Sequence, residues 1–340
     1  MEGAYLVVEE WGAFVGLHSE RLQVKKGRDI VREAPLLDLE GVIVAERGVS
    51  LSSDAIAACA DAGIPIHVVR PGGGVAASLF SAGLAGTIQT RRAQLQASGD
   101  RRGVALAKAF ALGKISNQAA LVRYTAKYRR ESEPALHREL SWLAGEIMDC
   151  TAELEGLDGD SAEAIRGNLL SIEGRAAEKY WSAVRLAVNV PEDWAGRRGR
   201  GATDPVNAAL NYGYGILYAQ VERAVLLAGL DPYAGFIHAD RPGKPSLVLD
   251  MVEEFRAPVV DRAIFAMINR GTKVETDADG LLVQESRRVI AENVLERLDR
   301  PERYERKKVA LRHIIQGQAR HVATFVRGER RLCRPFVVKW

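Results

Sequence analysis

The pattern of apolar residues changes near Gly86, and no other feature of the sequence constrains the fold as strongly. Before this point, short apolar or alternating runs are separated by Gly, Lys-Gly and Pro, which is typical of short strands. After it, long stretches rich in Ala, Leu, Arg and Glu show helical spacing. The change predicts an α+β protein with two domains, residues 1–86 and residues 87–340.

The N-terminal domain is predicted to be a small antiparallel β domain with one helix. Its expected strands are 5–8, 13–17, 21–24, 41–44 and 64–69. The connections between the first four runs leave too little room for crossover helices, which favours antiparallel pairing. Ser52 or Ser53 is placed to cap a short helix that continues through Ala62.

The C-terminal domain is predicted to be all-α. Its expected helices are 88–97, 102–129, 134–155, 161–188, 204–228, 246–270, 281–298 and 302–322. Pro258 removes a helical hydrogen bond, so the helix 246–270 is expected to divide into two segments that meet near Ala257. Residues 276–280, Thr-Asp-Ala-Asp-Gly, are typical of a tight turn or a small hairpin between helices.

Composition narrows the class of protein. The chain has 340 residues, of which 47% are hydrophobic, and this is enough to build folded cores. Its three cysteines are far apart and lack CxxC spacing, which disfavours structural zinc or a disulfide framework and favours a reducing cytoplasm. No apolar run approaches the ~18 residues of a membrane span, and the first ten residues lack the order of a signal peptide. We expect a cytoplasmic protein with no membrane partner.

The net charge of +3 is unevenly distributed along the chain. Residues 1–86 hold 7 Lys and Arg against 11 Asp and Glu, a balance of −4, whereas residues 300–340 hold 12 against 3, a balance of +9. A basic C-terminal end without a strongly apolar face favours nucleic acid over membrane as a partner. A solvated helical surface would have the same charge pattern.

One imidazole and several carboxylates occur together in residues 229–256. His238 lies in a loop, and Asp250, Glu253 and Glu254 lie at helical spacing i, i+3 and i+4 in the next helix. These residue types are ligands for a hard or borderline divalent cation. Alternatively, the carboxylates form a solvated face neutralised by Arg256 and Arg262, and His238 is a hydrogen-bonded core residue.

Glu173 favours the metal interpretation. It lies on the apolar stripe of the helix 161–188, with Leu169, Leu170, Ala176, Ala177 and Tyr180. Burial of an unpaired carboxylate costs several kcal/mol, and a metal ion or another cation is the usual partner. Lys114, Asn117 and Gln118 form a comparable polar stripe on the helix 102–129, which would also suit hydrogen bonds between helices.

Four motifs then occur in a recognisable order. They are Glu173-Gly174 with Tyr180-Trp181, Asp204-Pro-Val-Asn207 with Leu210-Asn-Tyr-Gly-Tyr214, Gly235-Phe-Ile-His238, and Ser246-Leu247 with Asp250-Met-Val-Glu253-Glu-Phe-Arg256. With these motifs, and with Lys114-Ile-Ser-Asn117-Gln118, essentially the whole chain resembles the CRISPR-associated adaptation endonuclease/integrase family.

The resemblance implies a metal-dependent DNA endonuclease/integrase that inserts new spacers into a CRISPR array by 3′-hydroxyl attack on repeat-end phosphodiesters. It implies Glu173, His238 and Glu253 as catalytic residues that bind Mg²⁺ or Mn²⁺, with Asp250 alongside. Many relatives have Asp where this chain has Glu253, so Asp250 or Glu254 could share or replace that role. It also implies a homodimer formed largely through the N-terminal domain, and a small second subunit of the adaptation complex.

The chemistry of these residues is consistent with that function, since a carboxylate-held Mg²⁺ or Mn²⁺ supports phosphodiester transfer. The expected DNA partners are double-stranded and branched DNA, namely the prespacer and the CRISPR repeat. The candidate phosphate contacts are Arg91, Arg92, Lys114, Arg303, Arg306, Lys307 and Lys308. Two alternatives remain, a structure-selective nuclease of branched DNA and a non-catalytic DNA-binding scaffold.

Overall fold

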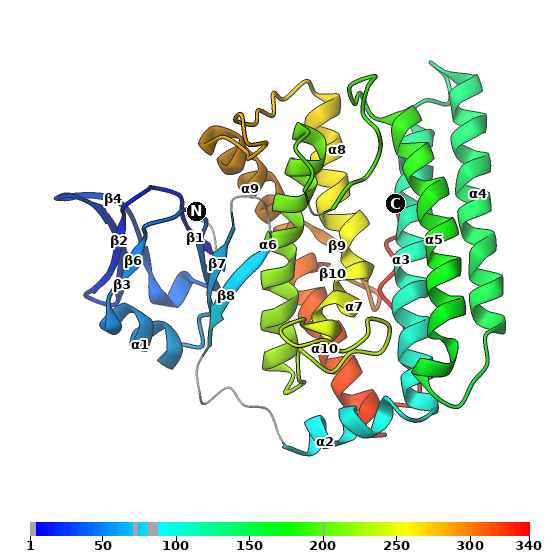
Figure 1. Ribbon diagram of the computed structural model, residues 1–340, viewed down its shortest axis with the longest axis horizontal. Helices are drawn as coiled ribbons and strands as arrows, with labels where there is room; N and C mark the ends of the chain where they lie inside the picture. Colours follow the sequence, from blue (N-terminus) through cyan, green and yellow to red (C-terminus); the bar gives the residue numbers. More distant parts are fainter. Residues whose placement is uncertain (1–4, 71–73, 81–87, 200) are drawn as a thin grey trace.

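The computed structural model describes residues 5–70, 74–80, 88–199 and 201–340, and it places a strand-rich part beside a larger helical part (Figure 1). This arrangement confirms the predicted α+β class. The predicted domain boundary at residue 86 lies within residues 81–87, outside the described residues, so the division into 1–86 and 87–340 stays a prediction.

The strand-rich part contains two four-stranded sheets and one helix. The first sheet has the order β1 (Tyr5–Val8), β5 (Gly41–Val44), β7 (Ile66–Val69), β8 (Val75–Leu79). The second has the order β4 (Asp29–Pro35), β3 (Arg21–Lys26), β2 (Phe14–His18), β6 (Ser50–Leu51). A short 3-10 helix, η1 (Leu36–Asp38), follows β4, and helix α1 (Ser53–Asp61) begins after its cap Ser52, as the sequence predicts.

The prediction of antiparallel pairing is wrong for part of these sheets. Strand β1 runs parallel to β5, β5 runs parallel to β7, and β2 runs parallel to β6. The connection from β1 to β5 passes through β2, β3 and β4, and the connection from β5 to β7 passes through α1. The antiparallel strands β2, β3 and β4 serve as the crossover between β1 and β5, so the chain can start a parallel strand without a crossover helix. The short spacings between the strands gave no sign of this connection.

Alternation along the first sheet divides its side chains between two cores. Leu6, Val8 and Val42 face the second sheet and form the core between the two sheets. The intervening Val7 and Ile43 belong to the core of the helical part. Strands β1, β5 and β7 are therefore buried on both faces, and the face of the sheet that lies away from the second sheet packs on the helices.

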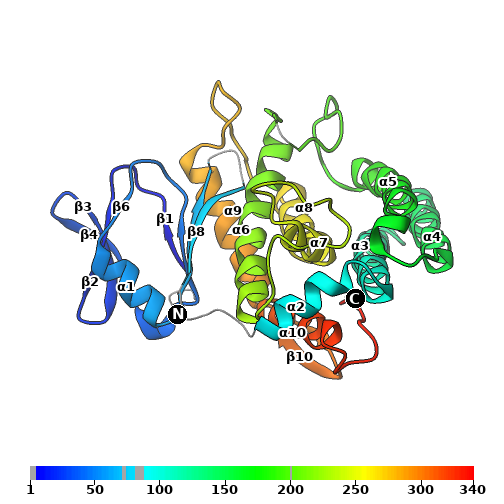
Figure 2. The same cartoon turned by 60° about the horizontal axis from the view of Figure 1, so that its bottom comes forward.

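The helical part is built largely from long helices. Its elements are α2 (Ile88–Ala97), α3 (Arg101–Lys127), α4 (Pro134–Gly156), α5 (Ala162–Ala187), α6 (Pro205–Leu227), α7 (Ser246–Phe255), the π-helical η3 (Arg256–Asp261), α8 (Arg262–Asn269), α9 (Gln284–Asp299), β9 (Pro301–Tyr304), β10 (Lys307–Ala310) and α10 (Leu311–Val326). Helices α3, α4 and α5 form one layer, α6 borders the sheet, and α7 lies between α6 and α3 (Figures 1 and 2).

The predicted break at Pro258 is confirmed, because the helical path from α7 to α8 widens into the π-helical segment that contains this proline. The turn at 276–280 is closed by a bridge between Thr276 and Leu282, as expected for a small hairpin. No helix among the described residues is long and apolar enough to cross a bilayer.

The prediction of an all-α C-terminal domain fails at residues 301–310, where β9 and β10 form a hairpin in place of the start of the helix 302–322. Its two turn residues, Glu305 and Arg306, have φ angles of 45° and 69°. Such mirror-image turns normally carry Gly or Asn, so Glu-Arg gave no turn signal. Arg303, Arg306, Lys307 and Lys308 therefore lie on a hairpin and not on a helix.

Strand β7 is joined to α6 through a buried polar chain. His67 is 1% exposed, and its Nδ1 lies 2.9 Å from Ser78 Oγ. Ser78 Oγ donates to Glu222 Oε2 at 2.7 Å, so His67 Nδ1–H is the donor to Ser78. Burial lowers the pKa of His67 to about 4, and burial raises the pKa of Glu222.

Replacement of His67 by Gln tests this chain through the pH dependence of unfolding. In the folded protein His67 stays neutral down to about pH 4, whereas the unfolded chain takes up the proton near pH 6.5. The His67 contribution is therefore complete above pH 6.5 and is lost as the pH falls toward 4, by up to about 3 kcal/mol. The free energy of unfolding, measured in urea at pH 4.5 and pH 8, should therefore differ between the two proteins in a pH-dependent way. Relative to the wild type, His67→Gln should be more stable at pH 4.5 than at pH 8. The same difference in free energy at both pH values would contradict the assignment.

Candidate active site

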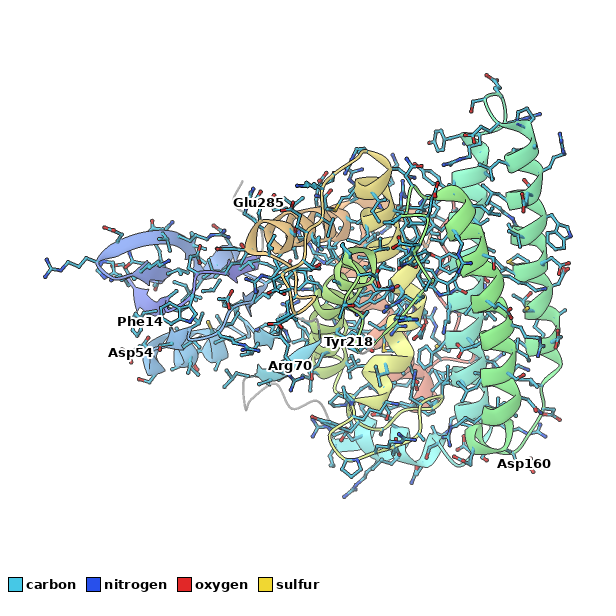
Figure 3. The ribbon with its side chains drawn as sticks, turned by 45° about the horizontal axis from the view of Figure 1, so that its top comes forward. Phe14, Asp54, Arg70, Asp160, Tyr218 and Glu285 are labelled. Carbon is cyan, nitrogen blue, oxygen red and sulfur yellow. The ribbon has the colours of Figure 1, made fainter. Side chains whose placement is uncertain are left out.

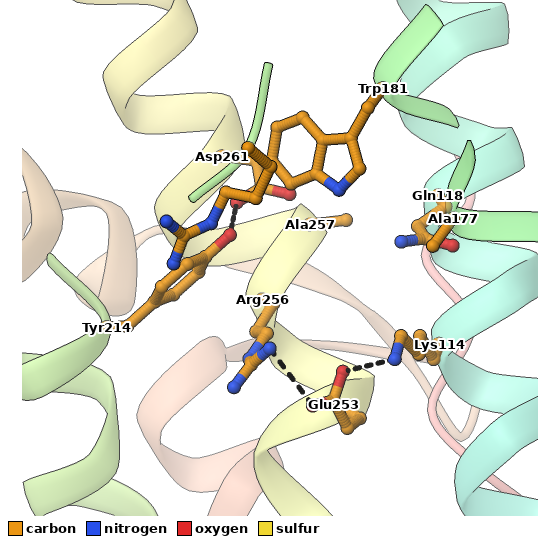
Figure 4. Close-up of a pocket in the computed structure, with 10 residues that line it drawn as sticks. Lys114, Gln118, Ala177, Trp181, Tyr214, Glu253, Arg256, Ala257 and Asp261 are labelled. Atoms are coloured by element: carbon orange, nitrogen blue, oxygen red, sulfur yellow. Dashed lines mark hydrogen bonds and ion pairs between the residues drawn. The ribbon is translucent and has the colours of Figure 1, made fainter. Parts of the chain in front are cut away.

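Helices α3, α5 and α7 bring one lysine and two glutamates together in a largely buried position. Lys114 Nζ on α3 lies 3.6 Å from Glu173 Oε1 on α5 and 3.0 Å from Glu253 Oε2 on α7. Arg256, one helical turn after Glu253, places Nη1 3.0 Å from Glu253 Oε1 (Figure 4). Glu173 and Glu253 are only 6% and 4% exposed. The inward direction predicted for Glu173 is confirmed, although Leu170 of the same predicted stripe is exposed.

The two carboxylates differ in how strongly they hold a proton. Burial opposes ionisation of Glu253, but Arg256 and Lys114 outweigh it and lower its pKa to about 2. Burial raises the pKa of Glu173, and Lys114 only partly offsets this effect. Burial also opposes the charge on Lys114, yet Glu253 and Glu173 raise its pKa. At neutral pH the group therefore contains a stable Lys114–Glu253 ion pair, with Glu173 beside it.

One oxygen on each carboxylate is left without a hydrogen bond. Glu173 Oε1 and Glu253 Oε2 are buried, and each has only the ion pair with Lys114 among the described residues. Two anionic oxygens that converge on one cation are suited to a divalent ion. As the side chains stand, however, no three His, Cys, Asp or Glu residues in the described part of the chain are close enough together to hold a metal ion.

His238 approaches the same centre from the loop before α7, and Asp250 fixes its orientation. His238 Nδ1 lies 2.7 Å from Asp250 Oδ1, so this ring nitrogen donates to the carboxylate, and in the neutral ring Nε2 carries the lone pair. The positive charge of His238, when present, contributes to lowering the pKa of both Glu173 and Glu253.

Asp250 has no oxygen left for an ion. Its Oδ2 accepts from the backbone N–H groups of Phe236 and Ile237 at 2.6 and 3.0 Å, and its Oδ1 accepts from the N–H of His238 at 3.0 Å. The loop can approach this closely because residue 235 is glycine, where a Cβ would lie 2.9 Å from Asp250 Oδ2. Asp250 is therefore a support for the loop and for His238.

Glu254 faces away from this centre. Its Oε2 accepts from the N–H of Phe336 at 3.0 Å, and burial raises its pKa to about 8. All three carboxylates of the helix are buried, so the alternative of a solvated acidic face is wrong. Arg256 does pair with Glu253, but Arg262 pairs with Glu302 at 3.4 Å.

A cavity of about 90 Å³ opens beside Glu253, and Figure 4 shows its walls. Its lining includes Lys114, Gln118, Trp181, Arg197, Tyr214, Arg256 and Asp261. Asp261 accepts from Tyr180 at 2.6 Å and from Tyr214 at 2.5 Å, which holds the Tyr214 ring beneath the Arg256 guanidinium. Sequence reasoning missed Arg197 and Asp261, because neither lies in a recognisable spacing with the carboxylates.

The site also borders a larger groove of about 1,330 Å³ between the sheet and α6. Its cationic side chains are Arg47, Arg70, Arg197, Lys244 and Arg256. Figure 3 labels Arg70 and Tyr218 on its walls, where the strand-rich and helical parts meet. The lining also contains the carboxylates Glu46 and Asp279, so the groove has a net positive lining, which reaches Arg256, next to Glu253.

The other predicted phosphate contacts lie apart from the carboxylates. Arg91 and Arg92 are on α2, and the four cations of the β9–β10 hairpin are all exposed. None of the four hairpin cations makes an ion pair with another described residue. Lys114 differs from them because it is held between carboxylates.

Comparisons with known proteins place the chain in one family. A family model described as CRISPR associated protein Cas1 matches residues 6–296. The chain is 39% identical to CRISPR-associated endonuclease Cas1 1 of Archaeoglobus fulgidus, over 98% of this chain and 99% of that protein. It is 32% identical to CRISPR-associated endonuclease Cas1 1 of Francisella tularensis subsp. novicida, over 99% of both.

Solved structures show the same fold. A casposase bound to its integration product superposes with a TM-score of 0.81 at 23% identity, covering 97% of this chain and 92% of that one. A Cas1 protein from Thermotoga maritima superposes with a TM-score of 0.77 at 17% identity, covering 95% and 97%. From the family match and the full-length relatives, the chain belongs to the Cas1 family of CRISPR-associated proteins.

Proposed function

We propose that the protein is a metal-dependent DNA endonuclease and integrase that inserts new spacers into a CRISPR array. The observation that carries this proposal is the buried Glu173–Lys114–Glu253 group, which stands at the end of a cationic groove. The names of the relatives support the endonuclease part, and the likeness to a casposase bound to its integration product is consistent with strand joining.

The ion in this proposal is Mg²⁺ or Mn²⁺, held by Glu173, Glu253 and His238 Nε2. The two glutamate oxygens that face Lys114, together with His238 Nε2, are a donor set that suits either metal. When bound, the ion would supply charge neutralisation for the phosphodiester undergoing attack. Asp250 takes the role of an orienting residue, because its oxygens are saturated by the loop and by His238.

The chain's own cations have separate roles. Lys114 keeps Glu253 ionised and directs its remaining donors toward the cavity, where a reacting phosphate would lie. Arg256, held over the Tyr214 ring at 4.8 Å, can donate to the next phosphate along the strand. A DNA 3′-hydroxyl oxygen forms the new bond to phosphorus, and the bond to the 3′-oxygen of the neighbouring strand segment breaks. With water in place of the hydroxyl, the same residues would cleave DNA.

The partners in this proposal are the prespacer and the CRISPR repeat, a second copy of the chain, and the small second subunit of the adaptation complex. A solved Cas6-RT-Cas1–Cas2 complex superposes with a TM-score of 0.78 at 20% identity, over 99% of this chain and 36% of that one. Arg91 and Arg92 on α2, of which only Arg92 is exposed, and the exposed cations of the β9–β10 hairpin are assigned to phosphates of the duplex. A DNA-binding scaffold would gain nothing from buried carboxylates beside its phosphate-binding surface.

The variants Glu173→Gln and His238→Ala test the catalytic assignment. Each removes one proposed metal ligand, so Mn²⁺-dependent joining of prespacer ends to a repeat should fall by at least about 100-fold, while DNA affinity stays within about two-fold. The assay needs the purified partner subunit, and Glu178→Gln, an exposed glutamate of the same helix, is the matched control.

Retained joining in both variants would overturn the assignment. If the wild type cleaves branched DNA but joins no ends, the nuclease alternative replaces the integrase. Joining and binding that do not depend on a divalent metal would favour the scaffold.

The pair Arg303→Ala and Lys308→Ala tests the hairpin. These residues lie opposite each other on β9 and β10, so their charges point to the same surface. Loss of two phosphate contacts should lower the magnitude of the salt slope of duplex binding by about 2, equally for all sequences. Lys273→Ala, which removes an exposed lysine outside the hairpin, is the control. An unchanged salt dependence of duplex affinity would mean that the hairpin cations face solvent and do not contact phosphate.

A further inference from the structure

The turn of helix that carries Glu253 has a backbone acceptor that lacks its usual α-helical donor. Pro258 has no N–H, so it cannot donate to the carbonyl oxygen of the residue four positions earlier, Glu254. Asn117 of α3 replaces that bond, since its Nδ2 donates to Glu254 O at 2.7 Å. The α7 backbone beside Glu253 therefore depends on a side chain from another helix.

Asn117 in turn is held by the C-terminal tail. The residue is completely buried, and its Nδ2 also donates to Phe336 O at 2.8 Å. The N–H of Val338 donates to Asn117 Oδ1 at 2.9 Å. Both ends of the Asn117 amide are thus satisfied, and a single side chain links α3, α7 and the tail.

The tail contacts α7 directly as well. The N–H of Phe336 donates to Glu254 Oε2 at 3.0 Å, and the Phe336 ring stacks on Phe255 with centroids 5.6 Å apart and planes 11° apart. Phe336 and Val338 are buried whereas Lys339 is exposed, so residues 335–340 alternate as an extended strand does. We call residues 335–340 the C-terminal strap.

The end of the strap is anchored by Trp340. Its indole N–H donates to Glu302 Oε1 at 3.1 Å, and the Arg262 guanidinium lies 4.3 Å above its ring. The Tyr124 ring on α3 is 5.0 Å away. The strap therefore runs along α3 and crosses the end of α7, which agrees with the position of the C-terminus beside α3 in Figures 1 and 2.

The geometry relates this contact to the catalytic group. Lys114 and Asn117 are three residues apart on α3, so they lie on neighbouring positions of one face. Lys114 pairs with Glu253, and Asn117 binds the carbonyl of the next residue, Glu254. A shift of α7 relative to α3 would change both contacts together.

We propose that the C-terminal strap is a positioning element for the reaction: by fixing the last turn of α7 against α3, it sets where the Glu253 carboxylate stands relative to Lys114 and Glu173. Asn117, Phe336 and Val338 act through Glu253 and do not touch DNA. The match to the family model ends at residue 296, so the strap lies outside it. The inference rests on the proposed strand-joining function, whose failure would appear in the wild type itself.

The substitution Val338→Pro tests the strap with minimal loss of side-chain volume. Proline removes the N–H that donates to Asn117, whereas Lys339→Pro, one residue later, removes an N–H with no hydrogen bond among the described residues and is the matched control. We expect Val338→Pro to lower the single-turnover joining rate about 10- to 100-fold. Duplex DNA affinity should stay within about two-fold, and the Mn²⁺ concentration for half-maximal rate should rise.

Hydrogen–deuterium exchange gives a readout that does not require activity. The amides of residues 253–257 should exchange faster in Val338→Pro than in Lys339→Pro. If Val338→Pro does not fold, Phe336→Leu takes its place, because it keeps the backbone bonds and loses the stack on Phe255. In that variant we expect a smaller fall in rate, with the same unchanged DNA affinity.

The outcomes separate the two levels of the account. A wild type that joins no DNA ends overturns the proposed function. A wild type that joins, together with a folded Val338→Pro or Phe336→Leu whose joining rate and Mn²⁺ dependence equal those of Lys339→Pro, overturns the strap alone. A fall in melting temperature with no change in rate assigns the strap to stability only and equally overturns the inference.

Discussion

The site depends on one buried ion pair, between Lys114 of α3 and Glu253 of α7. Burial of either charge alone would cost several kcal/mol, so each stabilises the other in the interior. Arg256 contributes a second positive charge, which keeps Glu253 ionised despite its burial. Glu173 then joins from α5. Helices α3, α5 and α7 therefore meet at a group of charged side chains, and burial of any one of these charges without the others would be unfavourable.

One turn and a half of α7 carries three carboxylates with three different environments. Asp250 accepts four hydrogen bonds from the preceding loop and from His238, and Glu254 is turned toward Phe336 with a pKa raised to about 8 by burial. Glu253 alone keeps an oxygen directed at Lys114 and Glu173. The proline that ends this helix adds a further constraint, since Asn117 must supply the missing hydrogen bond at Glu254.

Much of the fold could be predicted from the sequence, because the apolar spacing, the capping residues and the breaks of a long helix are all visible within its own stretch of sequence. The break at Pro258 and the inward direction of Glu173 follow from local rules. The parallel strands could not be predicted, because pairing direction depends on where a distant strand returns. The β9–β10 hairpin was missed because Glu305 and Arg306 adopt positive φ without glycine.

The residues of the candidate site could be picked out by residue type and spacing, the family resemblance supplied their expected roles, and their contacts required the structure. Spacing alone could not distinguish the roles of Asp250, Glu253 and Glu254, because all three are close together on one helix. Their partners come from the loop, from α3 and from the C-terminal strap. The contact between the C-terminal strap and α3 could not be predicted either, because Asn117 and Phe336 are 219 positions apart in the chain. Hydrogen bonds over such a separation produce no periodic pattern in the sequence.

The central claim is that Glu253, and not its neighbour, is the acidic residue of α7 that serves the reaction. A comparison of Glu253→Gln with Glu254→Gln in the Mn²⁺-dependent joining assay tests it most directly. Glu254 is already uncharged near neutral pH and its amide replacement can still accept from Phe336, so Glu254→Gln should lose less than about five-fold in rate. Glu253→Gln should lose at least about 100-fold with little change in DNA affinity. Equal losses in the two variants, or a larger loss in Glu254→Gln, would contradict the account.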